Sequence, residues 1–251
     1  NCLIFASEIK AIHQDPKVRN KPDYIAIHHY LTYQSVPSPF SAFEGIRKLP
    51  PAHYLICRNG KVEIKRYWKL SYLPKFIVKT PADIKELETE LLEKLKEAVR
   101  IRLISDVPLG AFLSGGMDSS VVVALMSQVM KEPVRTFSIG FHEKAYDELH
   151  YARIVAGRFQ TEHTDFQVRP NAVDILPKLV WHYNEPFADP SAIPSYYVSK
   201  LAKEHVTVVL NGDGGDESFA GYDRYVANEL AMRFERLPAF LRRRLFPLVA
   251  G

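Results

Sequence analysis

The chain has 251 residues, of which 47% are hydrophobic and 25% charged, a composition typical of globular proteins that bury a substantial core. Its formal net charge of +4 is spread along the chain and is a weak signal for nucleic-acid binding. The two cysteines, Cys2 and Cys57, match no metal or disulfide pattern, and no apolar run reaches the roughly 18 residues of a membrane span. We therefore expect a cytoplasmic protein whose partners are small molecules, not nucleic acids or membranes.

The first third of the chain has short alternating runs that predict a β-rich segment. Asn59-Gly60 separates two such runs, and Asn-Gly between alternating segments is the strongest short signal for a hairpin. The expected elements are a strand at 3–6, a capped helical turn at 7–12, a helix at 22–33 and hairpin strands at 52–57 and 62–68.

A domain boundary is expected where this pattern ends. Residues 71–80 contain Pro74 and have no clear period, as in a linker. Thr80 is a candidate N-cap, Pro81 suits the first helical position, and residues 82–103 carry an apolar stripe of helical period. The sequence thus predicts one domain at residues 1–75 and a second at 76–251.

In the second domain, short apolar strands alternate with helices. Strands are expected at 110–113, 134–139, 163–168 and 206–210, and helices at 117–130, 147–159, 171–182 and 192–204. This alternation predicts an α/β fold with a doubly wound, mostly parallel sheet. Two glycine-rich segments, residues 114–120 and 211–217, follow strands, and ligands bind at the carboxyl ends of strands in such sheets.

The first glycine-rich segment, Ser-Gly-Gly-Met-Asp-Ser-Ser, has the residues of a phosphate-binding loop. Gly115 and Gly116 allow the backbone to turn with its N–H groups exposed, and the following helix directs its positive end at the same point. Asp118 would repel phosphate unless a divalent cation such as Mg²⁺ lay between them. The alternative is an ordinary strand-to-helix turn in which Asp118 is a capping residue.

Two better-known motifs are excluded for this first loop. The first loop lacks the Lys of G-x-x-x-x-G-K-[ST] and does not match G-x-S-x-G, so Ser114 is not expected to be an acyl nucleophile.

The second glycine-rich segment, residues 211–217, contains Asp213, Asp216 and Glu217 among three glycines, with no Lys or Arg. These carboxylates would repel one another in a plain surface turn, so we favour a role with a cation or in proton transfer.

Together these segments resemble one family. Residues 114–120 resemble the signature loop of the ATP pyrophosphatases, and residues 107–113 and 212–217 narrow the resemblance to the glutamine-hydrolysing asparagine synthetases. Residues 136–141, 146–148, 185–194 and 220–225 also fit. Residues 5–11, 43–46, 48–51 and 67–68 resemble the end of that family's glutaminase domain, so the resemblance covers essentially the whole chain.

The resemblance implies an adenine-nucleotide alpha-hydrolase-like synthetase domain. It would adenylate the aspartate side chain with ATP, release pyrophosphate, and let ammonia from glutamine convert β-aspartyl-AMP to asparagine and AMP. By position, the implied nucleotide-binding residues are Leu113, Ser114, Gly115, Gly116, Asp118, Ser119, Ser120, Ile139, Asn211 and Gly212. Asp118 and Asp216 would bind Mg²⁺, and Asp213, Asp216 and Glu217 are the candidate catalytic carboxylates, with Asp213 as the proton-transfer group.

Two departures from the family pattern limit these expectations. The family's glutaminase nucleophile is an N-terminal cysteine, whereas Asn1 precedes Cys2, to which we assign no catalysis. A lysine that the family uses in adenylation has no match here, so both ends of the family pattern are expected to lie outside this chain. Amidation of a different carboxylate, in a peptide or an exopolysaccharide-linked pathway, and a non-catalytic nucleotide-binding module stay open as alternatives, as does a homodimer.

Overall fold

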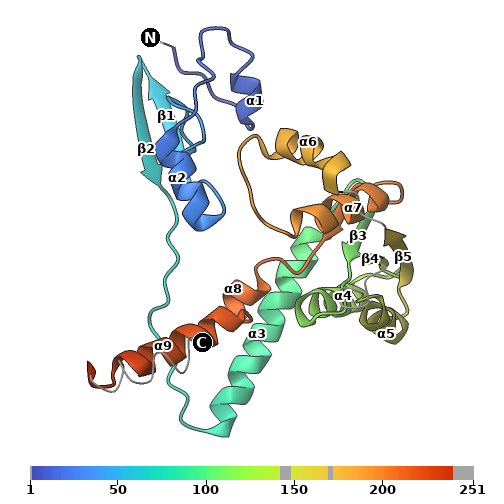
Figure 1. The fold of residues 1–251 in the computed structure, drawn as a ribbon. Coiled ribbons are helices and arrows are strands. Elements are labelled where there is room, and N and C mark those ends of the chain that lie inside the picture. Colours follow the sequence, from blue (N-terminus) through green and yellow to red (C-terminus); the bar gives the residue numbers. More distant parts are fainter. Residues whose placement is uncertain (1, 142–147, 169–171, 240–251) are drawn as a thin grey trace. The chain divides into compact units, whose positions relative to one another are not determined.

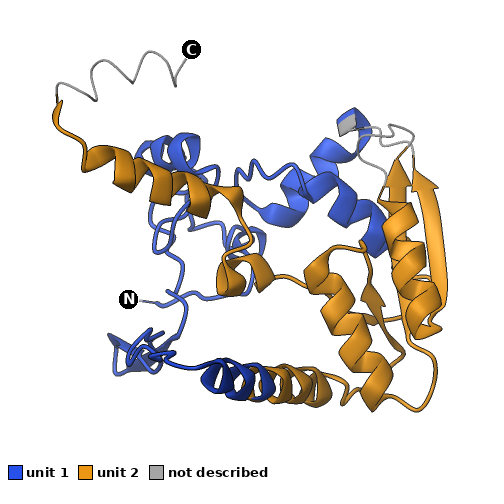
Figure 2. Ribbon diagram, turned by 90° about the horizontal axis from the view of Figure 1, so that it is seen from below, with its two compact units in different colours: residues 1–89, 169–200 blue, residues 90–168, 201–251 orange. Residues whose placement is uncertain are grey.

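The protein was analysed as a computed structural model that describes residues 2–141, 148–168 and 172–239. Its contacts divide the chain into two compact units, shown in different colours in Figure 2. Unit 1 comprises residues 1–89 and 169–200, and unit 2 comprises residues 90–168 and 201–251. Of the three boundaries between them, two fall within the helices α3 (Pro81–Arg102) and α7 (Ala192–Ala202), and the third follows Val168.

Unit 1 combines the first third of the chain with a helical pair from much later in the sequence. Its early elements are α1 (Ile9–Ile12), α2 (Tyr24–Tyr33), β1 (His53–Arg58) and β2 (Lys61–Arg66). Ala26 of α2 packs with Val36 and Ala42 in one small core. In a second core, Ile175 and Leu179 of α6 (Ala172–Tyr183) pack against the beginning of α7.

The hairpin prediction is confirmed, whereas the prediction of a strand at residues 3–6 is wrong. β1 and β2 pair antiparallel, and both turn residues have positive φ, 50° at Asn59 and 74° at Gly60, as a tight hairpin turn requires. Residues 3–6 have no regular secondary structure and pair with no strand of the described chain. A single extended segment cannot satisfy its backbone groups as a strand without a neighbour.

The predicted start of α3 is also confirmed, and its cap explains it. The Thr80 hydroxyl accepts a hydrogen bond from Asp83 N (3.3 Å), and the Asp83 carboxylate accepts one from Thr80 N (2.8 Å). This reciprocal pair is a capping box, with Pro81 at the first helical position, where its missing N–H costs nothing. Backbone N–H groups of Lys79 and Thr80 lower the pKa of the exposed Asp83 carboxyl.

Unit 2 is built on a parallel sheet, which confirms the predicted α/β class (Figure 1). The sheet order is β5-β4-β3-β6. Its strands are β3 (Leu109–Phe112), β4 (Arg135–Phe141), β5 (Glu162–Val168) and β6 (Val208–Leu210). Its helices besides the ends of α3 and α7 are α4 (Met117–Val129), α5 (Leu149–Phe159), α8 (Gly215–Phe219) and α9 (Asp223–Glu235).

The core of unit 2 lies between one face of this sheet and three helices. Ala111 of β3 and Leu210 of β6 are buried there with Val99 of α3, Val123 of α4 and Ala152 of α5. The chain runs from β3 outward through β4 to β5 and then returns to the other side of β3 as β6. Because the strand order reverses between β3 and β6, their carboxyl ends are where this fold class binds ligands.

Candidate functional site

The first glycine-rich loop connects β3 to α4. Leu113 continues the sheet, since its N–H donates to the Phe137 carbonyl oxygen (2.9 Å). Gly116 is the extended N-cap residue, with φ −67° and ψ 165°, and α4 begins at Met117. The first amides of a helix lack intrahelical acceptors, and its positive dipole end lies at the same place. The loop therefore has the backbone arrangement that suits an anion.

Two serine hydroxyls hold this loop in shape. The Ser119 hydroxyl accepts from Ser114 N (3.3 Å), donates to the Gly116 carbonyl (3.2 Å) and lies 3.0 Å from the Ser114 hydroxyl. The Ser114 hydroxyl in turn accepts from Gly116 N (3.2 Å). The Ser120 hydroxyl is buried without a hydrogen-bond partner among the described residues, so it remains available to a bound group.

Gly115 must be glycine for two separate reasons. Its φ of +85° is a conformation that other residues rarely adopt. A Cβ at this position would also lie 2.5 Å from the carbonyl carbon of Tyr151 and 2.6 Å from Ala152 N, at the beginning of α5. The neighbouring helix thus presses against the loop and fixes its path.

The second glycine-rich loop comes directly against the first. β6 pairs with β3, with Leu210 opposite Ala111, so the loops follow adjacent strands. A Cβ at Gly212 would lie 2.7 Å from Asp118 Cβ and 2.8 Å from Ser119 N, and a Cβ at Gly215 would overlap the Asp118 carboxylate. Residues that are about 95 positions apart in the sequence are therefore in contact, and the contact is possible only because the second loop lacks side chains there.

The acidic residues of the second loop have different surroundings. Asp213 is exposed, and Asn211 holds it by donating from Nδ2 to its carboxylate (2.7 Å) and accepting from its backbone N–H (3.3 Å). Asp216 is half-buried, and its carboxylate occupies the space that a Cβ at Gly221 would need. Asp213 is thus the carboxylate of the pair that is free to meet a ligand from solvent.

Glu217 is bound by a tyrosine that the sequence analysis did not name as a site residue. The Tyr222 hydroxyl donates to the Glu217 carboxylate (2.8 Å), which lowers the pKa of Glu217 and raises the pKa of Tyr222 to about 12. The Arg224 guanidinium lies 5.2 Å from the Tyr222 ring centre. Tyr222 could have been noticed in the sequence, because it follows Ala220 and Gly221 just after α8 and lies within residues 220–225, which resemble the family.

The residues predicted to hold Mg²⁺ are two carboxylates and do not form a complete protein cage. The described parts of the chain contain no group of three His, Cys, Asp or Glu residues arranged for a metal. Mg²⁺ is usually held by one or two carboxylates together with substrate phosphates and water. Gly215 places the first turn of α8 against the Asp118 carboxylate, and Asp216 follows it in that turn. That Asp118 and Asp216 hold Mg²⁺ stays a prediction.

The two apolar residues predicted to line the nucleotide pocket differ in burial. Leu113 is 1% exposed, and its side chain belongs to the core beneath the sheet. Its carbonyl oxygen accepts a hydrogen bond from the Ser138 hydroxyl. Ile139 is half-buried on β4, opposite Phe166 of β5. Their contact with a nucleotide stays a prediction, and Leu113 would contribute its backbone.

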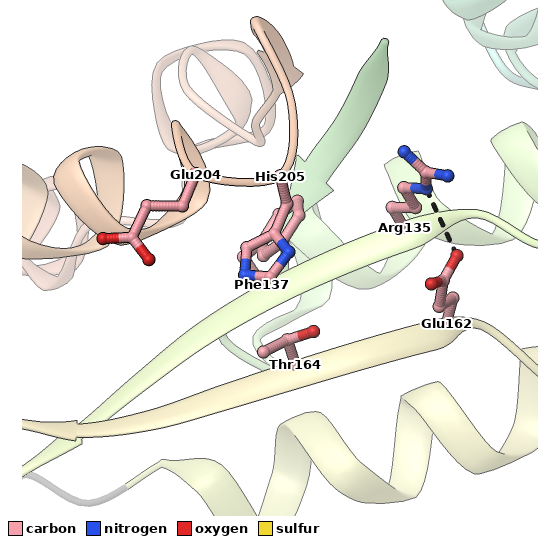
Figure 3. Close-up of a pocket in the computed structure, with 6 residues that line it drawn as sticks. All are labelled: Arg135, Phe137, Glu162, Thr164, Glu204 and His205. Atoms are coloured by element: carbon pink, nitrogen blue, oxygen red, sulfur yellow. Dashed lines mark hydrogen bonds and ion pairs between the residues drawn. The ribbon is translucent and has the colours of Figure 1, made fainter.

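A separate cavity of about 280 Å³ lies elsewhere in unit 2 (Figure 3). It is lined by Arg135, Phe137, Glu162, Thr164, Glu204 and His205. Arg135 and Glu162 pair across the beginnings of β4 and β5, whereas the glycine-rich loops follow the ends of β3 and β6. Because parallel strands all begin at the same edge, this cavity is not part of the candidate site.

Comparison with known proteins identifies the family of the chain. Residues 90–249 match the family described as "Asparagine synthase", and residues 1–68 match the "Glutamine amidotransferase domain". The chain belongs to the asparagine synthase family. The earlier resemblance is therefore confirmed, and both glycine-rich loops lie within the asparagine synthase match.

Curated relatives cover nearly all of the chain. It is 36% identical to "Asparagine synthetase [glutamine-hydrolyzing] 1" of Bacillus subtilis over 99% of the chain and 38% of that protein. It is 42% identical to "Putative asparagine synthetase [glutamine-hydrolyzing] 2" of Methanocaldococcus jannaschii over 96% of the chain and 47% of that protein. A fungal relative, "Amidase chry2" of Gibberella zeae, is 32% identical over 79% of the chain and 32% of that protein.

The chain thus spans less than half the length of each of these relatives. Among its described residues, no helix combines the length and the apolar character needed to cross a membrane.

Proposed function

We propose that this chain carries the ATP site of an enzyme that amidates aspartate to asparagine, with ammonia normally supplied by glutamine hydrolysis. The observation that carries the proposal is the contact between the two glycine-rich loops, in which Gly212 and Gly215 close on Asp118. This contact places an anion-binding helix terminus beside a group of carboxylates at the switch point of the sheet. Family membership and the names of the relatives support asparagine as the product.

In the first step, an oxygen of the aspartate side chain would attack the α-phosphorus of ATP. The bond from that phosphorus to the bridging oxygen breaks, and pyrophosphate leaves. Charge builds on the leaving group, where backbone amides in the first turn of α4 and the Ser120 hydroxyl would donate hydrogen bonds. Fixed donors of this kind stabilise a transition state without having to reorganise during the reaction.

In the second step, ammonia would attack the carbonyl carbon of β-aspartyl-AMP, and the bond to the AMP oxygen breaks. The attacking nitrogen must lose a proton. We assign that proton to Asp213, whose exposed carboxylate is oriented by Asn211 and carries no ion pair within the described residues. Glu217 contributes by holding the beginning of α8 in place through Tyr222.

Mg²⁺ bound by Asp118 and Asp216 would neutralise charge on the phosphates of ATP. A bound cation would also explain why carboxylates lie beside a phosphate site, because without it they would repel the phosphates. ATP and Mg²⁺ are thus the expected cofactors, and aspartate and ammonia the expected substrates.

The test is to incubate the whole protein with ATP, Mg²⁺, aspartate and ammonia and to identify the products. Asparagine, AMP and pyrophosphate in equal amounts are expected. ADP and phosphate would refute the proposed adenylation. Pyrophosphate release that requires a carboxylate other than aspartate would retain the chemistry and replace the acceptor.

A further inference from the structure

Unit 1 contains a contact between parts of the chain that match two different families. Residues 1–68 match the glutamine amidotransferase domain, whereas residues 169–200 lie within the asparagine synthase match. Both segments nevertheless belong to the same compact unit. The boundary between the two kinds of domain therefore passes through unit 1, and the residues that join it can be named.

Glu185, two residues after the end of α6, is the centre of this contact. One oxygen of its carboxylate pairs with the Lys48 ammonium, and the other accepts a hydrogen bond from Ala42 N (3.2 Å). The same ammonium donates to the Val36 carbonyl oxygen (2.7 Å). The Glu185 side chain is only 15% exposed and that of Lys48 31%. The Glu185 carboxylate thus contacts two positions of residues 36–48, Ala42 and Lys48, at the same time.

Backbone contacts flank this ion pair on both sides. Ala188 N donates to the Gln34 carbonyl oxygen (2.9 Å), and Phe187 forms an antiparallel bridge with Ser35. Nearer α6, Lys10 N donates to the Asn184 side chain (3.0 Å). These bonds set the register of residues 184–188 along residues 34–48.

The physical value of such a pair lies in specificity. Both side chains are half-buried, and partial burial of two charges costs free energy that offsets part of their attraction. Removing one partner leaves the other charge partly buried without its counter-charge, which is unfavourable. The pair therefore permits one alignment of the two segments and opposes shifted ones.

We propose that Lys48 and Glu185 are positioning residues that lock the amidotransferase segment onto the synthetase segment in one register. The consequence for activity rests on the proposed function, because ammonia released in one domain can be used in the other only if the two are aligned. Loss of the pair should then uncouple glutamine use from synthesis while each separate chemistry continues.

The structural test is hydrogen exchange on the protein with Glu185→Gln, with Lys48→Met and with both substitutions together. Each single substitution should raise exchange at residues 34–48 and 184–188 by about tenfold. The double variant should raise it little further, because both substitutions remove the same ion pair. Lys21→Met is the matched control, because Lys21 pairs with Glu44 in the same unit at an exposed position. Unchanged exchange in the single variants, or an equal effect in the control, would overturn the proposal.

The functional test compares glutamine with ammonia as the nitrogen source in the same variants. In the whole protein, asparagine formed per glutamine hydrolysed should fall about tenfold in the single variants and little further in the double variant, with ammonia-driven synthesis retained. If synthesis and hydrolysis stay fully coupled, the positioning role is refuted. If even the unaltered protein makes no asparagine from ammonia, the proposed function fails, and hydrogen exchange still decides whether the pair locks the segments. Exchange at β4, in unit 2, reports whether each variant is folded.

Discussion

Gly212 approaches the first turn of α4 so closely that one added methyl group should disable the site. In Gly212→Ala the new carbon would lie 2.7 Å from Asp118 Cβ, 2.8 Å from Ser119 N and 2.9 Å from the Asp118 carbonyl carbon. Two of these atoms are backbone and cannot rotate away, so either the loop or the helix must shift. Overpacking of this kind costs about 1–3 kcal/mol. A displacement of about 1 Å at a reacting centre costs about 100-fold in rate.

The assay measures both quantities on the same protein. We expect Gly212→Ala to lower the rate of pyrophosphate formation about 100-fold and to reduce the rise in melting temperature that saturating ATP and Mg²⁺ produce. Gly157→Ala is the control, because Gly157 lies in α5 with nothing within 4 Å of the added carbon. Alanine has a higher helix propensity than glycine, so this control substitution should stabilise the protein by up to about 1 kcal/mol. A Gly212→Ala protein with unaltered pyrophosphate formation would refute the loop contact as the basis of the site.

Three further predictions concern charges. Asp118→Asn should abolish pyrophosphate formation and leave the melting temperature without ATP nearly unchanged; an active variant would exclude Asp118 as a metal ligand. Tyr222→Phe removes the hydrogen bond that lowers the pKa of Glu217, so an NMR titration of the Glu217 carboxyl should show a higher pKa; an unchanged pKa would contradict the bond as its cause. The Asp83 pKa is lowered in the folded state, so its cap stabilises α3 above the unfolded pKa near 4 and is lost as pH falls through the lower folded value. Asp83→Asn should therefore make the melting temperature depend less on pH in this acid range.

Local signals accounted for most of the elements that were predicted correctly. Asn59-Gly60 requires two positive φ values in a tight turn, and Thr80 with Asp83 supplies both halves of a capping box. Each signal acts over four residues, so it can be read without knowing the fold. The prediction of a strand at residues 3–6 was wrong because a strand also needs a pairing partner, which a local apolar run does not reveal.

Contacts across the sequence could not be read in this way. Tyr222 lies within an expected motif, but its hydrogen bond to Glu217 depends on how the chain leaves α8. The pairing of Lys48 with Glu185 joins residues 137 positions apart. No periodicity or spacing in a single sequence relates such distant positions, because their proximity is set by packing.

The sequence by itself determined the chemistry of the two glycine-rich loops and the alternation of strands and helices around them. Backbone freedom, hydroxyl donors and carboxylates are properties of the residues, and parallel strands bring their carboxyl ends to one edge of a sheet. Only the tertiary structure decided that β6 returns beside β3, so that Gly212 and Gly215 meet Asp118. Strand order depends on which apolar faces pack together over the whole domain, and that packing makes two separate loops into one candidate site.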